Sequence, residues 1–428
     1  MPLLQSLPEA HNLAPGLDLL VQPDSRFKRG LLQFSFDCPL NQDSPARTLL
    51  SQVLPQGTQA YPSRRMLSRR TEELYGAGFH FGGSRAGDTH RMGLQLDWLA
   101  DRFLPKGESI ATDVQQLGYA LLNDPFREGG KSFSETVFTR EQDQLLRQIR
   151  AMKDDRTAFA EERFLFHLCQ GEPMGRSPWG TEEEVNALTV SCLESARLHL
   201  LKKAPITVVA VGPVDEPALV EFLLEHFVSS EIRDAEPVQA HKTPETLREV
   251  QETHEVDQAK FHFGFRAATP ETPEEMEALG LANMVLGGGI QGRLFREIRE
   301  KRSLAYGISS QLQTRKGLLT VSAGIDASSY AEVRDEVLAQ IHDMQEVGVQ
   351  GEELEMAFAA IRNALQGLAD SPGGLANYIA REHRLGFQRT PQERIERLRD
   401  YGPEHLAVAA RSWKPDLVYL LSAKGEKS

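Results

Sequence analysis

Sequence landmarks in the first part of the chain return in the second part at an almost constant distance. The matching pairs, with offsets of 230, 231 and 230 residues, are Gly57 with Gly287, residues 74–76 with 305–307, and Gly87 with Gly317. The middle pair is Leu-Tyr-Gly against Ala-Tyr-Gly. Because three landmarks at one offset rarely coincide by chance, we predict two homologous halves built to the same plan.

Each half combines strand patterns with helical patterns. In the first half, residues 79–82 and 89–98 have the pattern of a β-hairpin, and Ser63 is placed to cap a basic amphipathic helix. Apolar runs at residues 207–212 and 417–421 predict the closing strand of each half. We therefore predict an α+β fold in which each half is an antiparallel β-sheet with helices packed on one face.

The composition changes after Ser229, where large apolar residues become scarce and charged residues frequent. Such a segment is typical of an exposed linker or an edge strand between domains. We predict an N-terminal half at residues 1–229, a linker or edge strand at residues 230–258, and a C-terminal half at residues 259–428.

Charge and composition exclude several classes of protein. The 428 residues carry a formal net charge of −13, with 40% hydrophobic and 25% charged residues, as in ordinary globular proteins of more than one domain. This acidity argues against nucleic-acid and anionic-membrane partners. The three cysteines are far apart, the N-terminus has no basic leader, and no uncharged stretch approaches about twenty residues. We therefore expect a cytoplasmic protein without a membrane segment.

The most informative stretch is residues 286–310, which read LGGGIQGRLFREIREKRSLAYGISS. Three consecutive glycines, Gly287, Gly288 and Gly289, predict a flexible turn with positive φ and close backbone approach. Apolar residues at helical spacing then predict a helix over residues 293–302, and an alternating run after it predicts a strand. A helix that ends in cations is thus expected to lead directly into a hairpin.

This stretch closely resembles the signature of the C-terminal domain in the pitrilysin/insulinase family, the inverzincin metallopeptidases. In that family a glycine-rich loop precedes the pattern SRLF..IREK.SLAYGI.S. The resemblance implies that Arg299 and Tyr306, with the glycine loop, hold the substrate backbone and the developing oxyanion opposite a zinc ion. Without the resemblance, the simpler interpretation is structural: Arg299 would be a solvated cation at a helix end, and Tyr306 a half-buried strand residue.

The metal site of active family members is absent from the corresponding positions. Those members carry His-x-x-Glu-His on a helix before a Gly-Thr pair. The resemblance places the two ligand histidines at Thr48 and Gln52, the general base at Ser51, and the third ligand at Gln148, seven residues after Glu141. Threonine, serine and neutral amides neither bind zinc strongly nor take a proton from a metal-bound water. We therefore expect no metal and no cofactor in this chain.

The spacing of the histidines supports the same expectation without reference to a family. The closest pair, His254 and His262, is eight residues apart, so no helix can offer two imidazoles one turn apart. His167, and His342 with Glu346, come nearest to local ligand sets, but a core histidine and a solvated surface pair are simpler interpretations. The chain also lacks a Gly-x-Ser-x-Gly elbow and the Lys-Ser/Thr of a phosphate loop.

These observations predict a non-catalytic, substrate-binding subunit of a heterodimeric zinc metallopeptidase, which supplies Arg299 and Tyr306 to a partner's active site. Residues 57–79 resemble bacterial family members that are encoded beside a second, catalytic member. The expected partners are a catalytic paralogue with His-x-x-Glu-His, which would hold the zinc, and a peptide or unfolded protein. Two alternatives stay open. One is an inactive scaffold or binding homodimer resembling the core subunits of respiratory complexes, and the other is an enzyme with a relocated metal site.

Overall fold

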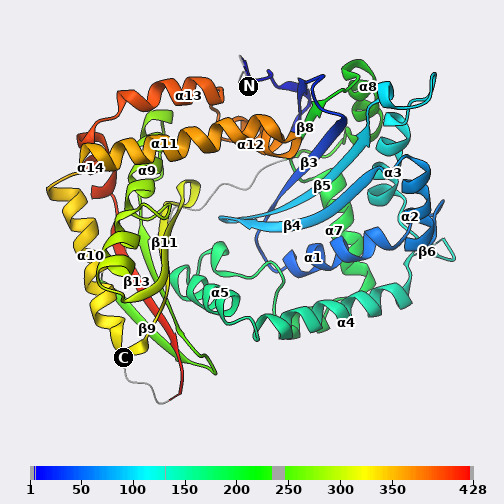
Figure 1. Ribbon diagram of the computed structural model, residues 1–428. Coiled ribbons are helices and arrows are strands. Elements are labelled where there is room, and N and C mark those ends of the chain that lie inside the picture. Colours follow the sequence, from blue (N-terminus) through cyan, green and yellow to red (C-terminus); the bar gives the residue numbers. More distant parts are fainter. Residues whose placement is uncertain (1–3, 5, 131, 234–245, 425–428) are drawn as a thin grey trace. The chain divides into compact units, whose positions relative to one another are not determined.

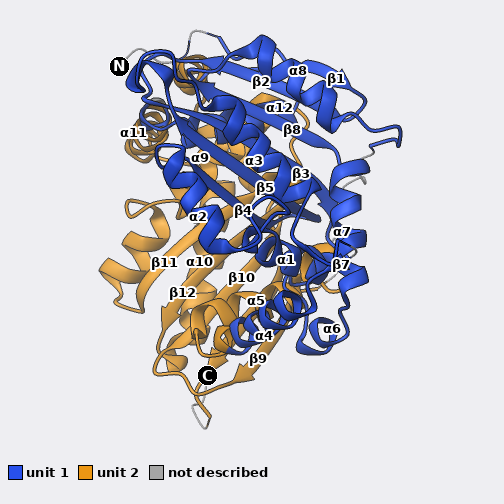
Figure 2. Cartoon of the chain, turned by 90° about the vertical axis from the view of Figure 1, so that its right-hand side faces the viewer, with its two compact units in different colours: residues 1–150, 176–237, 367–390 blue, residues 151–175, 238–366, 391–428 orange. Residues whose placement is uncertain are grey.

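The computed structural model describes residues 4, 6–130, 132–233 and 246–424. The chain divides into two compact units, which Figure 2 colours separately. Unit 1 consists of residues 1–150, 176–237 and 367–390, and unit 2 of residues 151–175, 238–366 and 391–428. Part of the predicted linker, residues 234–245, lies outside the described residues. The division into halves at 1–229 and 259–428 stays a prediction.

The sheet of unit 1 has the strand order β1-β2-β8-β3-β5-β4. The strands are β1 (His11–Ala14), β2 (Leu17–Pro23), β3 (Arg29–Pro39), β4 (Gly78–Ala86), β5 (Thr89–Leu99) and β8 (Ile206–Gly212). β8 is apolar and buried along almost its whole length, which favours a central position with both faces covered. It lies between β2, to which it is parallel, and β3. The consecutive strands β2 and β3 are therefore not neighbours.

The sheet of unit 2 repeats this order as β9-β13-β10-β12-β11. The strands are β9 (Arg248–Thr253), β10 (Ala259–Arg266), β11 (Ala305–Gln313), β12 (Leu318–Ile325) and β13 (Lys414–Ser422). β13 is parallel to β9 and antiparallel to β10, as β8 is to β2 and β3. Gly87 and Gly317 match as well, since both have a φ of 62° in the hairpin turns. The prediction of two homologous α+β halves is confirmed, and each sheet contains one parallel pair among antiparallel ones.

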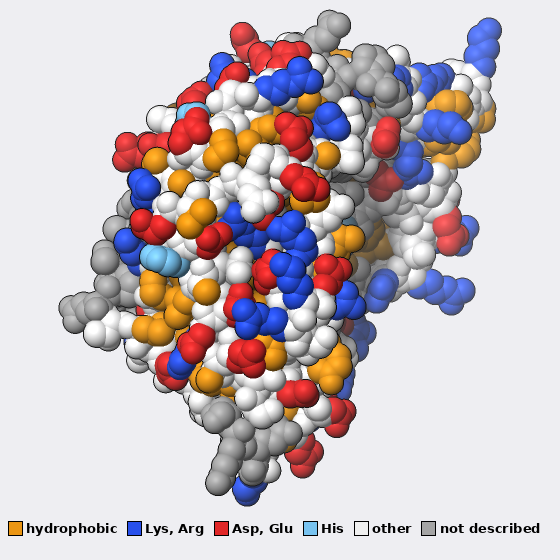
Figure 3. Space-filling view, turned by 60° about the vertical axis from the view of Figure 1, so that its left-hand side comes forward, with side chains coloured by type: hydrophobic (Ala, Val, Ile, Leu, Met, Phe, Trp, Pro, Cys, Tyr) orange, Lys and Arg blue, Asp and Glu red, His pale blue; other side chains and the backbone are white. Residues whose placement is uncertain are grey.

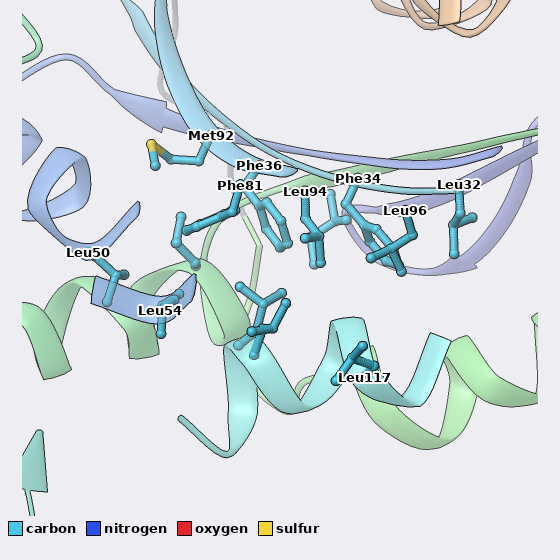
Figure 4. Close-up of a cluster of buried hydrophobic side chains, with 14 of the residues drawn as sticks. Leu32, Phe34, Phe36, Leu50, Leu54, Phe81, Met92, Leu94, Leu96 and Leu117 are labelled. Atoms are coloured by element: carbon cyan, nitrogen blue, oxygen red, sulfur yellow. The ribbon is translucent and has the colours of Figure 1, made fainter. Parts of the chain in front are cut away.

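Helices cover one face of the unit 1 sheet and enclose its main core (Figure 1). They are α1 (Ser44–Val53), α2 (Arg64–Glu73), α3 (Ala111–Asn123), α4 (Glu135–Met152), α6 (Glu182–Asn186), α7 (Val190–Lys202) and α8 (Glu216–Phe227). Alternate side chains of β3 and β5, among them Phe34, Phe36 and Leu94, point toward Leu50 and Leu117 of the helices (Figure 4). The period-two apolar pattern of these strands thus becomes one buried face.

The corresponding face in unit 2 is covered by helices from the second half of the chain. They are α9 (Pro273–Leu286), α10 (Tyr330–Glu346), α11 (Gly351–Gly367) and α14 (Pro403–Arg411), and α13 (Pro391–Arg397) precedes α14. Phe261, Phe263 and Phe265 of β10 point into this core and are fully buried. Their spacing leaves the intervening residues of β10 on the other face of the sheet.

Helices also pack on the second face of each sheet, which the sequence did not predict. In unit 1, α12 (Pro372–Arg384) places Leu375 and Ile379 against Val209 and Val211 of β8. In unit 2, α5 (Arg156–Leu168) covers part of β10 and β13. Gly264 permits this approach, because a Cβ atom there would lie 2.6 Å from a methyl carbon of Leu168.

The distribution of surface charge and the character of the helices relate to the expectation that the chain binds neither nucleic acid nor a membrane. On the face shown in Figure 3, basic side chains lie close to acidic ones, as expected for a chain with many ion pairs. Among the described helices, none has the length and apolar character that crossing a membrane requires.

Candidate functional site

The glycine loop is fixed between the end of α9 and strand β11. The amides of Gly287 and Gly288 donate to Asn283 O at 3.0 and 2.9 Å, and Ser310 N donates to Gly287 O at 2.8 Å. Gly287 has an extended φ of −170°, so positive φ is not the reason for glycine here. The reason is close approach, because a Cβ atom on Gly288 would lie 2.9 Å from Met284 Cα. The loop is a crowded connection and not a loose turn.

The helix after this loop differs from a regular α-helix. Residues Phe295–Lys301 form a π-helix, η4, whose buried side chain Ile298 faces the unit 2 core. Segments of π-helix are uncommon and occur often at functional sites. Leu304 N donates to Ile298 O at 2.9 Å, and only residues 302–304, with Ser303 at a φ of 55°, separate the π-helix from β11.

Arg299 and Tyr306 are held together where this helix meets β11. Arg299 Nε donates to the backbone oxygen of Tyr306 at 3.0 Å, and its guanidinium carbon lies 4.6 Å from the centre of the Phe295 ring. The register with β12 shifts between Ala305 and Gly307, so Tyr306 is the extra residue of a β-bulge. Its side chain is 68% exposed. A regular strand would place Tyr306 on the same face as the buried Ile308. Because of the bulge, Tyr306 is exposed instead.

A pocket of about 590 Å³ opens beside these residues within unit 2. Its lining residues are Thr157, Gln258, Lys260, His262, Gly288, Gly289, Ile290, Phe295, Tyr306, Gly307, Ile308, Ser309, Ser322, Ala323 and Gly324. Tyr306 and two of the predicted glycines therefore share one pocket, and Arg299 adjoins it through Phe295. The basic residues of β10 were not predicted from sequence. The phenylalanine alternation at residues 261, 263 and 265 is the signal that could have placed them on this face.

The four positions that correspond to a zinc site lie together in unit 1. Thr48, Ser51 and Gln52 share one face of α1, since they are three and four residues apart, and Gln148 comes from α4. All four line a pocket of about 580 Å³. Other carboxamides line the same pocket, namely Gln33, Gln95 and Asn377. The structure thus brings together the positions that the resemblance assigned.

The side chains at these positions do not fit a zinc ion. Gln52 Nε2 donates to Gln148 Oε1 at 2.9 Å, Thr48 Oγ1 donates to Pro178 O at 2.6 Å, and Ser51 Oγ donates to Thr48 O at 2.7 Å. Gln52 Oε1 is buried without a hydrogen-bond partner in the described chain, and one neutral oxygen is a poor zinc ligand. Within the described residues, no group of three or more His, Cys, Asp or Glu side chains could hold a metal.

We expect metal analysis of the dialysed protein to find far less than one zinc per chain. The physical reason is the neutral and mutually hydrogen-bonded donor set of α1 and α4. A matched variant with Thr48→His, Ser51→Glu, Gln52→His and Gln148→Glu should gain zinc, because imidazole and carboxylate ligands would then share one pocket. Stoichiometric zinc in the unmodified chain that is lost on Thr48→Ala or Gln52→Ala would contradict this assignment.

Three features can be compared with known proteins: a duplicated α+β fold, neutral side chains at the positions of a zinc site, and an Arg/Tyr pair beside a glycine loop. Residues 193–361 match a protein family described as the peptidase M16 inactive domain. The resemblance to the pitrilysin/insulinase-type zinc peptidases is confirmed. The chain is similar to M16 metallopeptidase homologues, and its sequence lacks the His-x-x-Glu-His motif.

Two curated proteins and one solved structure illustrate what the chain is similar to. The chain is 24% identical over 409 residues to the probable inactive metalloprotease YmfF of Bacillus subtilis, covering 95% of this chain and 96% of that protein. It is 28% identical over 279 residues to the uncharacterized zinc protease Mb2805c of Mycobacterium bovis, covering 63% of each. A crystal structure of a conserved protein from Enterococcus faecalis matches with a TM-score of 0.88 at 22% identity, covering 99% of this chain and 100% of that one.

Proposed function

We propose that this chain is the non-catalytic, substrate-binding subunit of a heterodimeric zinc metallopeptidase. One contrast carries the proposal. The positions that would hold a metal carry neutral side chains, whereas Arg299 and Tyr306 are held together beside an open pocket. The similarity to a probable inactive metalloprotease supports it. A catalytic paralogue with His-x-x-Glu-His would supply the zinc and the general base.

The contribution of this chain would be hydrogen-bond donors. Arg299 uses Nε to bind the Tyr306 carbonyl, and no described residue pairs with its two terminal nitrogens, which can donate to a substrate carbonyl. The phenol of Tyr306 is exposed and can donate to the oxyanion that forms during peptide hydrolysis. The link between Arg299 and the Tyr306 backbone fixes the two donors relative to each other.

The pocket is suited to a peptide backbone. Gly307 offers no side chain along its floor, and no atom lies within 4 Å of where its Cβ would be, so an extended chain could approach β11 closely there. We propose a peptide or an unfolded protein as the substrate. We also keep the cytoplasm as the proposed compartment, on the basis of the three well-separated cysteines.

Assembly tests this proposal. Co-expression with an M16 paralogue that carries His-x-x-Glu-His should yield a complex with one copy of each chain, measured by size-exclusion chromatography with light scattering. That complex should contain one zinc ion per copy of the paralogue. The zinc should be lost when the histidines of the paralogue's His-x-x-Glu-His motif are replaced. A stable homodimer of this chain that does not exchange with the paralogue would favour the scaffold alternative instead.

A further inference from the structure

The floor of the unit 2 pocket consists of two rows of residues that cross three neighbouring strands. The rows are Ser309, Ser322 and His262, and Gly307, Gly324 and Lys260. Since alternate residues of β10 point to opposite faces, its phenylalanines turn to the core while Lys260 and His262 turn to the pocket. The floor therefore has small residues on β11 and β12 and two nitrogen-bearing side chains at the β10 end, and the Gln258 side chain lies over Gly324.

Lys260 is the only charged residue among the described residues that line this pocket. It is half-buried, and its Nζ lies 3.4 Å from Gln258 Oε1. Within the described chain no carboxylate pairs with Lys260, whereas buried basic residues of the same unit, such as Arg293 and Lys316, pair with glutamates. In a chain with a net charge of −13, a half-buried lysine without a carboxylate indicates a site for an anionic group.

His262 does not compete with Lys260 as a cation. It is 5% exposed, its Nδ1 lies 2.9 Å from Ser322 Oγ, and its ring stacks on Phe164 at 5.1 Å. Burial, and then the charge of Lys260, lower the pKa of His262 to about 4. At neutral pH the imidazole is therefore uncharged, and Lys260 is the fixed charge on the floor of the pocket.

We propose that Lys260 forms a carboxylate-binding subsite for an extended peptide in this pocket. The inference rests on the proposed function, in which the same pocket holds substrate. A lysine ammonium donates charge-assisted hydrogen bonds to a carboxylate, and a partly buried pair is screened less by salt than a surface pair. The amide of Gln258 and the hydroxyl of Thr157 line the same pocket and can donate to the remaining carboxylate lone pairs.

The strand spacing sets the position of this carboxylate along the peptide. Lys260 and Gly307 are in register across Gly324, so they are two strand spacings apart, which is about 10 Å. An extended peptide rises about 3.3 Å per residue. The carboxylate is therefore expected about three residues from the carbonyl that meets Arg299 and Tyr306.

Titration calorimetry on the full chain tests the subsite with three short acetylated peptides of alanine, serine and glycine. The first has one central Glu and an amidated end, the second has Gln instead and a free C-terminal carboxylate, and the third has Gln and an amidated end. At least one carboxylate peptide should bind roughly tenfold tighter than the neutral peptide. Whichever of the first two shows this gain identifies a side-chain or a terminal carboxylate as the ligand.

Variants at Lys260 test whether this residue causes the preference for carboxylate peptides over the neutral peptide. Lys260→Met should abolish the preference, Lys260→Arg should keep most of it, and Lys414→Met, at an exposed position of β13, should not change it. Equal affinity for charged and neutral peptides, a preference that survives Lys260→Met, or no binding of either carboxylate peptide would overturn the subsite. Failure of the proposed function gives a different result. In that case complexes with Arg299→Ala would cleave peptide at the full rate, while the preference of this chain for carboxylate peptides would still be observed.

Discussion

Tyr306→Phe is expected to slow peptide cleavage by the mixed complex roughly a hundred- to thousandfold, as is usual when one oxyanion donor is lost. Arg299→Ala should cost at least as much, since it removes the proposed substrate donors of Arg299 and the hydrogen bond from Arg299 Nε to Tyr306 O. Because these donors act on the transition state, kcat should fall as much as kcat/KM. The measurement is steady-state cleavage of a quenched fluorescent peptide by purified complexes.

Tyr75→Phe provides the matched control. Tyr75 belongs to the repeated landmark of the first half and is also exposed, but its phenol donates to Glu108 Oε2 at 2.6 Å and does not line the unit 2 pocket. This variant should retain full activity in the complex. Thermal melting and complex formation of Tyr306→Phe should match the unmodified chain, because an exposed phenol contributes little to packing. Full activity of both Arg299→Ala and Tyr306→Phe would reduce the pair to structural residues.

The second large effect concerns stability. Lys316→Met should destabilise unit 2 by about 3 kcal/mol, the usual scale for removing one partner from a buried ion pair. Lys316 Nζ lies 2.7 Å from Glu172 Oε2, and Arg266 bridges Glu172 to Asp416. All four side chains are at most 4% exposed. The melting temperature of this unit, followed by calorimetry, should fall by roughly 6–12 °C.

The pH dependence of this loss provides an internal check. Burial would raise the pKa of Glu172, but hydrogen bonds from Arg266 and Lys316 outweigh it and lower the pKa below the usual 4.5. At pH values above the unfolded pKa of Glu172, its lowered pKa stabilises the folded state. This stabilisation is lost as the pH falls through the pKa of Glu172 in the folded state. The difference between Lys316→Met and the unmodified chain should therefore shrink in acid. Lys301→Met, at an exposed surface pair, should change stability by less than about 0.5 kcal/mol, and an equal effect of both variants would contradict the role of burial.

Local sequence patterns predicted the elements whose residues are close in the chain. The hairpin of β4 and β5 and the cap of α2 follow from alternation, a turn glycine and a serine whose side chain accepts from Met66 N. The duplication predicted the architecture as well, because one plan used twice leaves matching landmarks. Pairing between distant strands left no such local signal. β8 lies between β2 and β3 and is buried along almost its whole length, and this pairing depends on helices that come from distant parts of the chain.

The candidate site was predictable in its residues but not in its shape. The positions of Thr48, Ser51, Gln52 and Gln148 could be assigned from the resemblance to active family members, and they do share one pocket. The π-helix and the bulge at Tyr306 could not be predicted, since alternation places Tyr306 with Ile308 on one side of the strand. A one-residue bulge separates them, leaving Ile308 buried and Tyr306 exposed. Such irregularities depend on tertiary contacts, which local propensity does not encode.

The most direct test of the central claim is the rate of peptide cleavage by this chain alone, by its catalytic paralogue alone, and by both together. The proposed function predicts no cleavage by this chain alone, with or without added zinc. It also predicts that the mixture cleaves far faster than the paralogue alone, and that this gain is lost when the added chain carries Tyr306→Phe. Cleavage by this chain alone, or a paralogue whose rate is indifferent to the added chain, would contradict the account.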